Sequence, residues 1–361
     1  MPHGSASLPA TDDRSRGAST GSSAGISPAD AAALALLAPI ASELIRVEKV
    51  FDNELESDLP AVNTLVKHVR RFRGKMLRPI LLLLTGKAAA PDADLTEAHI
   101  RLAATVEMVH MSTLVHDDVL DEAELRRKGA TLNHLRGNEA AVLLGDYLIS
   151  HSYHLCSSVD PVGELDARWA ARVIGATTNR LCEGELLQID NRNNLSLDEE
   201  TYYEIVRRKT GALTATSCLL GARFSGASEA VGQAMDRFGE IIGIAFQVQD
   251  DVLDLVGSTR EVGKTLGIDV EKQKLTLPLI HFLQHAPAEH RELLTSLLRS
   301  REPDRAERIR NLVLPSSSVD FARAAARKLT EDARRELQML PESDIRAVLE
   351  GVCDFVVSRQ H

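Results

Sequence analysis

Two short acidic segments of this chain share the sequence Asp-Asp-Val-Leu-Asp, and their side chains could bind a divalent metal ion. Six carboxylates belong to them: Asp117, Asp118 and Asp121 in the first, and Asp250, Asp251 and Asp254 in the second. Carboxylates one helical turn apart share a face and repel each other unless cations are present. Such hard oxygen ligands suit Mg²⁺, which is commonly shared with substrate phosphates. One copy alone could be a solvated charge cluster; two copies predict two helices facing a cavity and clamping a metal-bound diphosphate.

Basic residues near these segments could bind the same phosphates. Arg126 and Arg127 follow the first segment and offer forked donors. Lys75 and Arg78 precede an apolar run in which Pro79 fits the first turn of a helix. The dipole of that helix would add to their attraction for an anion. Either cation taken alone is equally compatible with an ordinary surface position.

Two later segments combine glycine with lysine. Gly211 permits a break in helical pattern and leaves Lys209 and Thr210 at a bend. Residues 257–267 contain three glycines and predict a mobile loop that could close over a phosphate. This loop does not have the GxxxxGK[ST] pattern, and no predicted strand precedes it.

The elements that position these residues are predicted to be helices. Helical patterning is nearly continuous from Pro28 onward, without alternation of the length that strands need. The apolar runs 102–115 and 241–248 predict buried helices that end in the two acidic segments. His110 lies two turns before Asp117 on the same helix face. A histidine there is usually a satisfied core residue, and its alignment with Asp117 is the argument for a functional role.

Capping patterns and prolines predict where several helices begin. Asp94 with Glu97 and Ser196 with Glu199 resemble capping boxes. Other helices are predicted at residues 60–72, 138–158, 168–190 and 232–255. The predicted fold class is therefore all-α.

Composition narrows the class of protein. Of 361 residues, 44% are hydrophobic and 4% aromatic, a balance that favours helix over sheet. The net charge of −10 argues against nucleic acid as a partner. The four cysteines lack metal-ligand spacing and suit reduced thiols in the cytoplasm. No apolar run predicts a transmembrane helix. Residues 1–28 have the composition of a disordered tail, which leaves residues 29–361 as a single helical domain.

From about Leu65 to Leu283 the chain resembles the trans-polyprenyl diphosphate synthases. Five motifs in the family's order carry the resemblance: Gly-Lys-Met-Leu-Arg-Pro (74–79), His-Asp-Asp-Val-Leu-Asp with Leu-Arg-Arg (116–127), Lys-Thr-Gly-Ala-Leu (209–213), Phe-Gln-Val-Gln-Asp-Asp-Val-Leu-Asp (246–254) and Gly-Lys (263–264). The resemblance implies an isoprenoid-synthase fold, with antiparallel helices around a central cavity, and a homodimer.

The resemblance also implies roles for the matched residues. The six aspartates would bind about three Mg²⁺ ions that bridge an allylic diphosphate. The other implied roles are binding of isopentenyl diphosphate by Lys75, Arg78, His110 and Arg127, binding of the allylic diphosphate by Arg126, Lys209, Lys264 and Lys274, and catalysis by Lys209, Thr210 and Gln247. Thr210 and Gln247 would lie beside the reacting carbons, where oxygen dipoles stabilise an allylic cation.

The implied reaction condenses isopentenyl diphosphate with an allylic diphosphate to give an all-trans polyprenyl diphosphate. In the resembling family, short-chain synthases carry aromatics at the positions held here by Ser112 and Thr113, with Val109 about one turn below. Both residues are small, so we expect a long product of about C30 to C50. Release of so apolar a product would suit peripheral contact with a membrane.

Several alternatives stay open at this point. The enzyme could be a geranylgeranyl diphosphate synthase, or the catalytic subunit of a hetero-oligomeric synthase. A terpene cyclase has no need for the second diphosphate site implied by Lys75, Arg78 and Arg127. A non-catalytic partner subunit usually lacks one acidic segment, and both are intact here.

Overall fold

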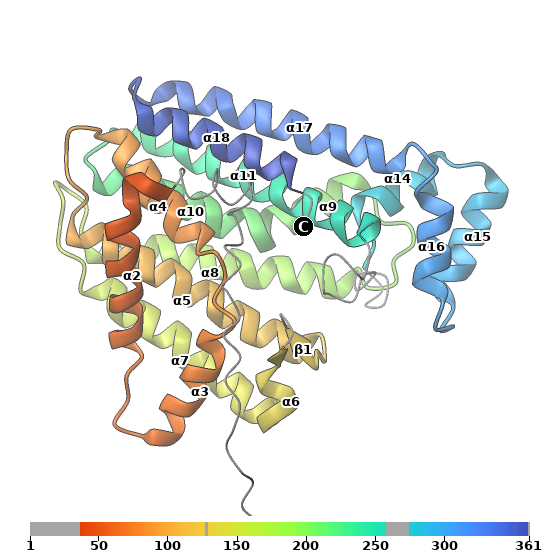
Figure 1. Cartoon of the computed structure of the whole chain (residues 1–361), viewed down its shortest axis with the longest axis horizontal. Helices are drawn as coiled ribbons and strands as arrows, with labels where there is room; N and C mark the ends of the chain where they lie inside the picture. The colour runs from red at the N-terminus through yellow and green to blue at the C-terminus, as the bar shows by residue number, and fades with distance from the viewer. Residues whose placement is uncertain (1–36, 127–128, 258–273, 360–361) are drawn as a thin grey trace, which may run out of the picture. The chain divides into compact units, whose positions relative to one another are not determined.

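The computed structural model of the chain describes residues 37–126, 129–257 and 274–359. The predicted tail at residues 1–28 and nearly all of the glycine-containing loop at 257–267 lie outside these ranges. The described residues belong to one compact unit. Within them the only strands are β1 (Leu125–Arg126) and β2 (Gly129–Ala130), so the all-α prediction is confirmed (Figure 1).

Helices account for the rest of the regular structure. They are α2 (Ala41–Glu54), α3 (Pro60–Arg70), α4 (Leu77–Ala89), α5 (Glu97–Leu120), α6 (Leu132–Arg136), α7 (Asn138–Ser157), α8 (Ala167–Asp190), α9 (Glu199–Val206), α10 (Ala212–Phe224), α11 (Glu229–Val256), α14 (Leu277–His285), α15 (Ala288–Arg299), α16 (Arg305–Val313), α17 (Ser318–Glu336) and α18 (Asp344–Ser358). Short turns of other helix types are η1 (Ala38–Ile40), η2 (Arg207–Gly211) and η3 (Leu337–Met339). None of the described helices has the length and apolar character needed to cross a membrane.

The interior is built around helices that are apolar on nearly every side. The four consecutive leucines of α4, residues 81–84, are fully buried, as expected of a helix surrounded by others. The most extensive packing joins α10 to α11, α5 to α7, α11 to α17 and α4 to α10. The first half of α11 packs into this main core, and its second half packs into another cluster with α9 and α14 to α17. The second acidic segment therefore lies in the part of α11 that packs into the second cluster.

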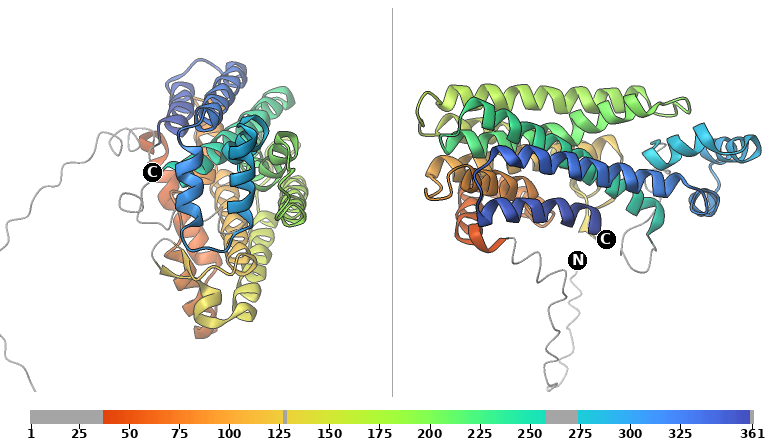
Figure 2. Two further views of the ribbon diagram at one scale, coloured as in Figure 1. Left: turned by 90° about the vertical axis from the view of Figure 1, so that its right-hand side faces the viewer. Right: turned by 90° about the horizontal axis from the view of Figure 1, so that it is seen from above.

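The last part of the chain extends this second cluster. Helices α15 and α16 pack against each other as a hairpin at one end of the unit (Figures 1 and 2). They carry neither acidic segment, and they support the site through the packing of α14 against α9 and α11 and through the bond from Arg310 of α16 to the carbonyl of Val256.

Two predicted helix starts are wrong by about half a turn. The N-cap of α5 is Thr96 rather than Asp94, and its partner is His99 instead of Glu97. Burial lowers the pKa of His99 to about 4, so the neutral ring accepts from the backbone N–H of Thr96. The N-cap of α9 is Asp198, whose carboxylate accepts from the N–H of Thr201, rather than Ser196. In both cases the residue nearer the helix adopts the extended conformation that an N-cap requires.

The segment η2 is a turn of π-helix that passes between α8 and α11. A Cβ added to Gly184 of α8 would lie 2.7 Å from the backbone nitrogen of Lys209. A Cβ added to Gly243 of α11 would lie 2.9 Å from the Cα of Gly211. These two glycines let three backbones approach closely. Gly211 itself has helical angles, so the predicted break is instead a widened turn that continues into α10.

Candidate active site

The first acidic segment forms the C-terminal end of α5. Asp117 and Asp118 lie in the last turn, and Asp121 is the C-cap. Asp118 is buried, and the guanidinium of Arg126 on β1 donates to it, with Nε 2.9 Å from Oδ1. This ion pair links β1 to the end of α5. The two elements lie side by side in Figure 1.

The other two carboxylates of the segment face cations from distant parts of the chain. The Nζ of Lys209 lies 3.5 Å from Oδ2 of Asp117. The Nζ of Lys274, just before α14, lies 3.3 Å from Oδ2 of Asp121, and Nη2 of Arg192 lies 3.6 Å from its Oδ1. Since the end of α5 is also the negative end of its dipole, these cations offset an unfavourable concentration of charge.

Hydrogen bonds from α9 and, through Gln247, from η2 hold the second segment. Asp251 is buried, and it accepts from the hydroxyl of Tyr202 at 2.6 Å and from the amide of Gln247 at 2.8 Å. The Oε1 of Gln247 in turn accepts from the hydroxyl of Thr210 at 3.1 Å. The segment η2 therefore reaches both acidic segments, through Lys209 on one side and Thr210 on the other.

The remaining aspartates of the second segment lie nearer the surface. Asp250 is 2.8 Å from Nη1 of Arg359, which follows α18 and also stacks on the ring of Phe246. Asp254, one turn further along α11, is half-buried. The end of the described chain thus covers part of this segment.

A cavity of about 130 Å³ lies beside Asp251 of the second segment. Five of the residues singled out from the sequence line it: Lys209, Thr210, Gln247, Asp251 and Lys274. Because Lys209 and Lys274 also face Asp117 and Asp121, the structure brings both acidic segments to one site. Arg127 and Lys264 lie outside the described residues.

The electrostatics of the site favour an added cation. Burial raises the pKa of Asp117, and Lys209 opposes that shift while Glu185 and Asp121 reinforce it. Burial lowers the pKa of Lys209, but Asp117 and the contacting carboxylate of Glu185 outweigh it, so the net shift is upward. The mostly buried carboxylates of Asp117 and Glu185 thus share the ammonium group of Lys209. This set of hard oxygen donors fits a divalent ion such as Mg²⁺.

The predicted second phosphate site lies at the start of α4. Lys75 is exposed, with its Nζ 5.9 Å from the ring centroid of Phe355. Arg78 lies in the first turn of α4, where burial lowers its pKa and the buried carboxylate of Glu107 opposes that shift. His110, three residues after Glu107 on α5, is half-buried. Arg78 and His110 therefore both lie near one face of α5.

The three residues considered for product length differ in their surroundings. Ser112 is buried and donates to the carbonyl of Gly145 on α7, at 2.9 Å. Val109 is fully buried, whereas Thr113 is half-buried and donates to the carbonyl of His110 at 2.8 Å. Of the three, Thr113 has the most accessible side chain.

Several site residues had not been inferred from the sequence: Glu107, Glu185, Arg192, Tyr202 and Arg359. No local pattern marks them, since their partners are far away in the chain. For example, Tyr202 and Asp251 are 49 positions apart, and Arg359 and Asp250 are 109 apart. They are identified only by tertiary packing, such as that of α8 on η2 and of α9 and α18 on α11.

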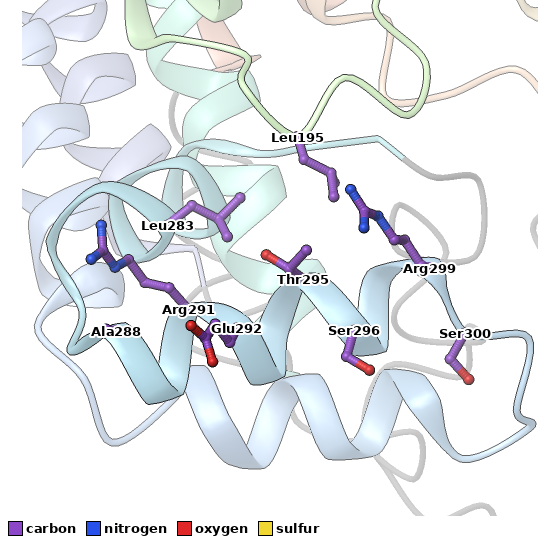
Figure 3. Close-up of a pocket in the computed structure, with 9 residues that line it drawn as sticks. All are labelled: Leu195, Leu283, Ala288, Arg291, Glu292, Thr295, Ser296, Arg299 and Ser300. Carbon is purple, nitrogen blue, oxygen red and sulfur yellow. The ribbon is translucent and has the colours of Figure 1, made fainter.

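A larger groove, of about 700 Å³, lies away from the acidic segments. It runs along α15 beneath Leu195 and Leu283, with Arg291 and Arg299 at opposite ends (Figure 3). Its lining contains none of the residues singled out from the sequence, so the candidate active site is the smaller cavity.

Comparison with known proteins agrees with this geometry. The family model for polyprenyl synthetase matches residues 60–314, so the chain belongs to that family and is a prenyltransferase. It is 32% identical over 324 residues to the all-trans-nonaprenyl-diphosphate synthase (geranyl-diphosphate specific) of Rhodobacter capsulatus, covering 90% of this chain and 97% of that protein.

Two solved structures are similar over most of the chain. A polyprenyl synthase from Caulobacter crescentus CB15, complexed with calcium and isoprenyl diphosphate, has 30% identity and a TM-score of 0.82, covering 90% of this chain and 97% of that one. A decaprenyl diphosphate synthase from Rhodobacter capsulatus has 31% identity and the same TM-score, covering 92% and 100%. The fold is therefore the isoprenoid-synthase fold.

The charge balance at Asp117 yields a first prediction. Asp117→Asn removes a buried negative charge while keeping the side chain's shape. Without divalent metal, it should therefore raise the Tm by roughly 1–2 °C for each kcal/mol relieved, since the entropy of unfolding grows with chain length. Prenyl transfer should nevertheless fall by more than about 100-fold, because a ligand for the metal is lost. Thermal unfolding and steady-state turnover measure the two effects. The exposed Asp320→Asn on α17 is the control and should change neither. Near-normal turnover of Asp117→Asn would contradict the assignment.

Proposed function

We propose that this chain condenses isopentenyl diphosphate with an allylic diphosphate and repeats the step, giving an all-trans polyprenyl diphosphate of about C30 to C50. The observation that carries the proposal is the convergence of both acidic segments on one cavity through Lys209 and Thr210. The similarity to nonaprenyl and decaprenyl diphosphate synthases supports a long product. We place the enzyme in the cytoplasm with peripheral membrane contact, which cell fractionation would test.

The first step in this proposal is binding of the allylic diphosphate between the two segments. Asp117, Asp121 and Asp250 would hold about three Mg²⁺ ions, with the other aspartates completing the set. When bound, the metal supplies charge neutralisation to the departing diphosphate. In the structure, Lys209 and Lys274 neutralise Asp117 and Asp121 themselves. Metal binding would release these cations to hold phosphate oxygens instead.

Next to this site, Thr210 and Gln247 are positioned to stabilise the allylic cation. The hydroxyl of Thr210 donates its proton to Gln247, so its lone pairs remain available to the cavity. Gln247 is in turn oriented by its bond to Asp251. Fixed oxygen dipoles of this kind stabilise positive charge without reorganising during the reaction. The released diphosphate would accept the proton that leaves after carbon–carbon bond formation.

For isopentenyl diphosphate we propose the basic residues at the start of α4, with His110. Lys75→Ala should raise the Michaelis constant for isopentenyl diphosphate by about tenfold, since a hydrogen bond to a charged group is worth about 1.5–3 kcal/mol. The Michaelis constant for the allylic substrate should not change. Lys75 is exposed, so the fold is not at risk. Lys67→Ala, an exposed lysine on the preceding helix, is the matched control. Equal effects on both substrates would overturn the assignment.

The product length depends on the side chains of α5 that line the path of the growing chain. Small side chains at Ser112 and Thr113 leave room for the chain to pass the first turn before Asp117. Purified protein incubated with isopentenyl and farnesyl diphosphates should therefore give products of about C30 to C50. Chromatography against prenyl standards measures their length.

A substitution on α5 tests whether this helix sets the product length. With geranyl diphosphate as the allylic substrate, Thr113→Phe should shorten the product to about C15–C20, because the ring would fill the space of the first turn. Consumption of the allylic substrate should stay intact. Thr113→Val, of similar shape, should not shorten the product. Ser112→Phe is a less direct test, since Ser112 packs on α7. A wild-type product of C15 or C20, or an unchanged product from Thr113→Phe, would mean that this helix does not set the length.

We also propose that the enzyme is a homodimer. Leu135 on α6 and Val142 and Leu143 on α7 are exposed large apolar residues on two helices in contact, which suits a covered interface. Wild-type protein should sediment at twice the 39.4 kDa chain mass, and Leu143→Asp should sediment as the single chain. Leu293→Asp, at an exposed leucine of α15, is the control and should remain dimeric. A monomeric wild-type protein would rule the proposal out.

A further inference from the structure

A second group of metal-ligating side chains lies away from the acidic segments, where α2 ends against α7 (Figure 1). Glu54 is the last residue of α2, and His151 and His154 are one turn apart on α7. Both imidazoles direct Nδ1 at the same atom, Oε1 of Glu54, at 3.1 Å from His151 and 2.6 Å from His154. One ligand atom of each residue lies within 4.8 Å of the other two.

The chemistry of these three side chains differs from that of the aspartates. Two imidazole nitrogens and one carboxylate oxygen form the ligand set of zinc sites that keep a fourth position for water. Ligand atoms around a tetrahedral zinc ion lie about 3.3 Å apart when the bonds are about 2.0–2.1 Å long. The nitrogen–oxygen separation of 3.1 Å at His151 is close to that value, and the 2.6 Å separation at His154 would lengthen by about 0.7 Å on metal binding. Imidazole nitrogen also favours zinc over magnesium.

We propose that Glu54, His151 and His154 bind a divalent transition-metal ion, for which Zn²⁺ is the probe. The ion would be additional to those held by the acidic segments. Binding requires each Nδ1 to give up the proton that it now shares with Glu54, either to solvent or to the other ring nitrogen.

The surroundings of the group suit such an ion. The side chains of Glu54 and His151 are 16% and 27% exposed, so two ligands are largely fixed by packing. The ring of Tyr147 packs on His151 with centroids 4.2 Å apart, which restricts rotation of that imidazole. The side chain of His154 is 76% exposed and leaves access for the ion and its water.

An ion here would join two parts of the chain that are distant in sequence. Helix α2 packs mainly on α5, and Glu54 is its last residue. A metal bridge from Glu54 to α7 would fix the end of α2 and resist its separation from the core. The ion would therefore stabilise the fold, and prenyl transfer supported by Mg²⁺ should not require it.

The test is a calorimetric titration of the full-length protein with Zn²⁺ in excess Mg²⁺, so that the acidic segments are already occupied. Wild-type protein should show a zinc-binding step, and zinc should raise its Tm. His154→Ala and Glu54→Gln should weaken that step by more than about 100-fold, because each removes a direct ligand. His290→Ala, an exposed histidine on α15, is the matched control and should retain the step.

Two further readouts keep the test independent of folding. Because His154 is largely exposed, its replacement should leave the zinc-free Tm unchanged. Co²⁺ in place of Zn²⁺ should give the intense visible absorption of a tetrahedral site in wild type and lose it in His154→Ala. If wild-type protein shows no zinc step under excess Mg²⁺, or if His154→Ala keeps both the step and the cobalt spectrum, the proposal is wrong.

Discussion

The burial of negative charge at the end of α5 is the constraint on which the site depends. A helix end already carries partial negative charge, and Asp117, Asp118 and Asp121 add to it. Removing carboxylates from water is costly unless cations face them. Arg126 neutralises Asp118 in the structure. Asp117 has a looser contact with Lys209, whose Nζ lies 3.5 Å away, and burial raises its pKa. The fold thus tolerates, at Asp117, a carboxylate that a metal ion would stabilise.

The position of η2 connects the first acidic segment to the second. Because Gly184 and Gly243 lack side chains, α8 and α11 both approach the π-helical turn closely. Lys209 then reaches the first acidic segment, and Thr210 reaches the second through Gln247. An ordinary α-helical turn would rotate these adjacent residues to different positions relative to the two neighbouring helices. The wide turn is therefore part of what joins the two clusters of charge.

The sequence predicts the features that depend on local pattern. Helices α7, α8 and α11 begin and end within about three residues of prediction, because their apolar periodicity and flanking polar residues are local signals. At α5 and α9 the predicted capping residues were wrong, and for α5 the reason is tertiary: His99 caps it while bonded to Ser225 on another segment. The same holds for the site. The repeated Asp-Asp-Val-Leu-Asp segments can be read from sequence, whereas Tyr202 joins the site only because α9 packs beside α11.

The small residues Ser112 and Thr113 on α5 also show that tertiary packing cannot be predicted from the sequence. From the sequence, Ser112 and Thr113 are equivalent evidence for an open path along the helix. In the structure, Ser112 donates to the carbonyl of Gly145, and a Cβ added to Gly145 would lie 2.1 Å from Nε2 of His116. The close approach of α5 and α7 is thus a sufficient physical reason for a small residue at 112. Packing does not require the same at the half-buried Thr113, so that residue carries the argument for a long product.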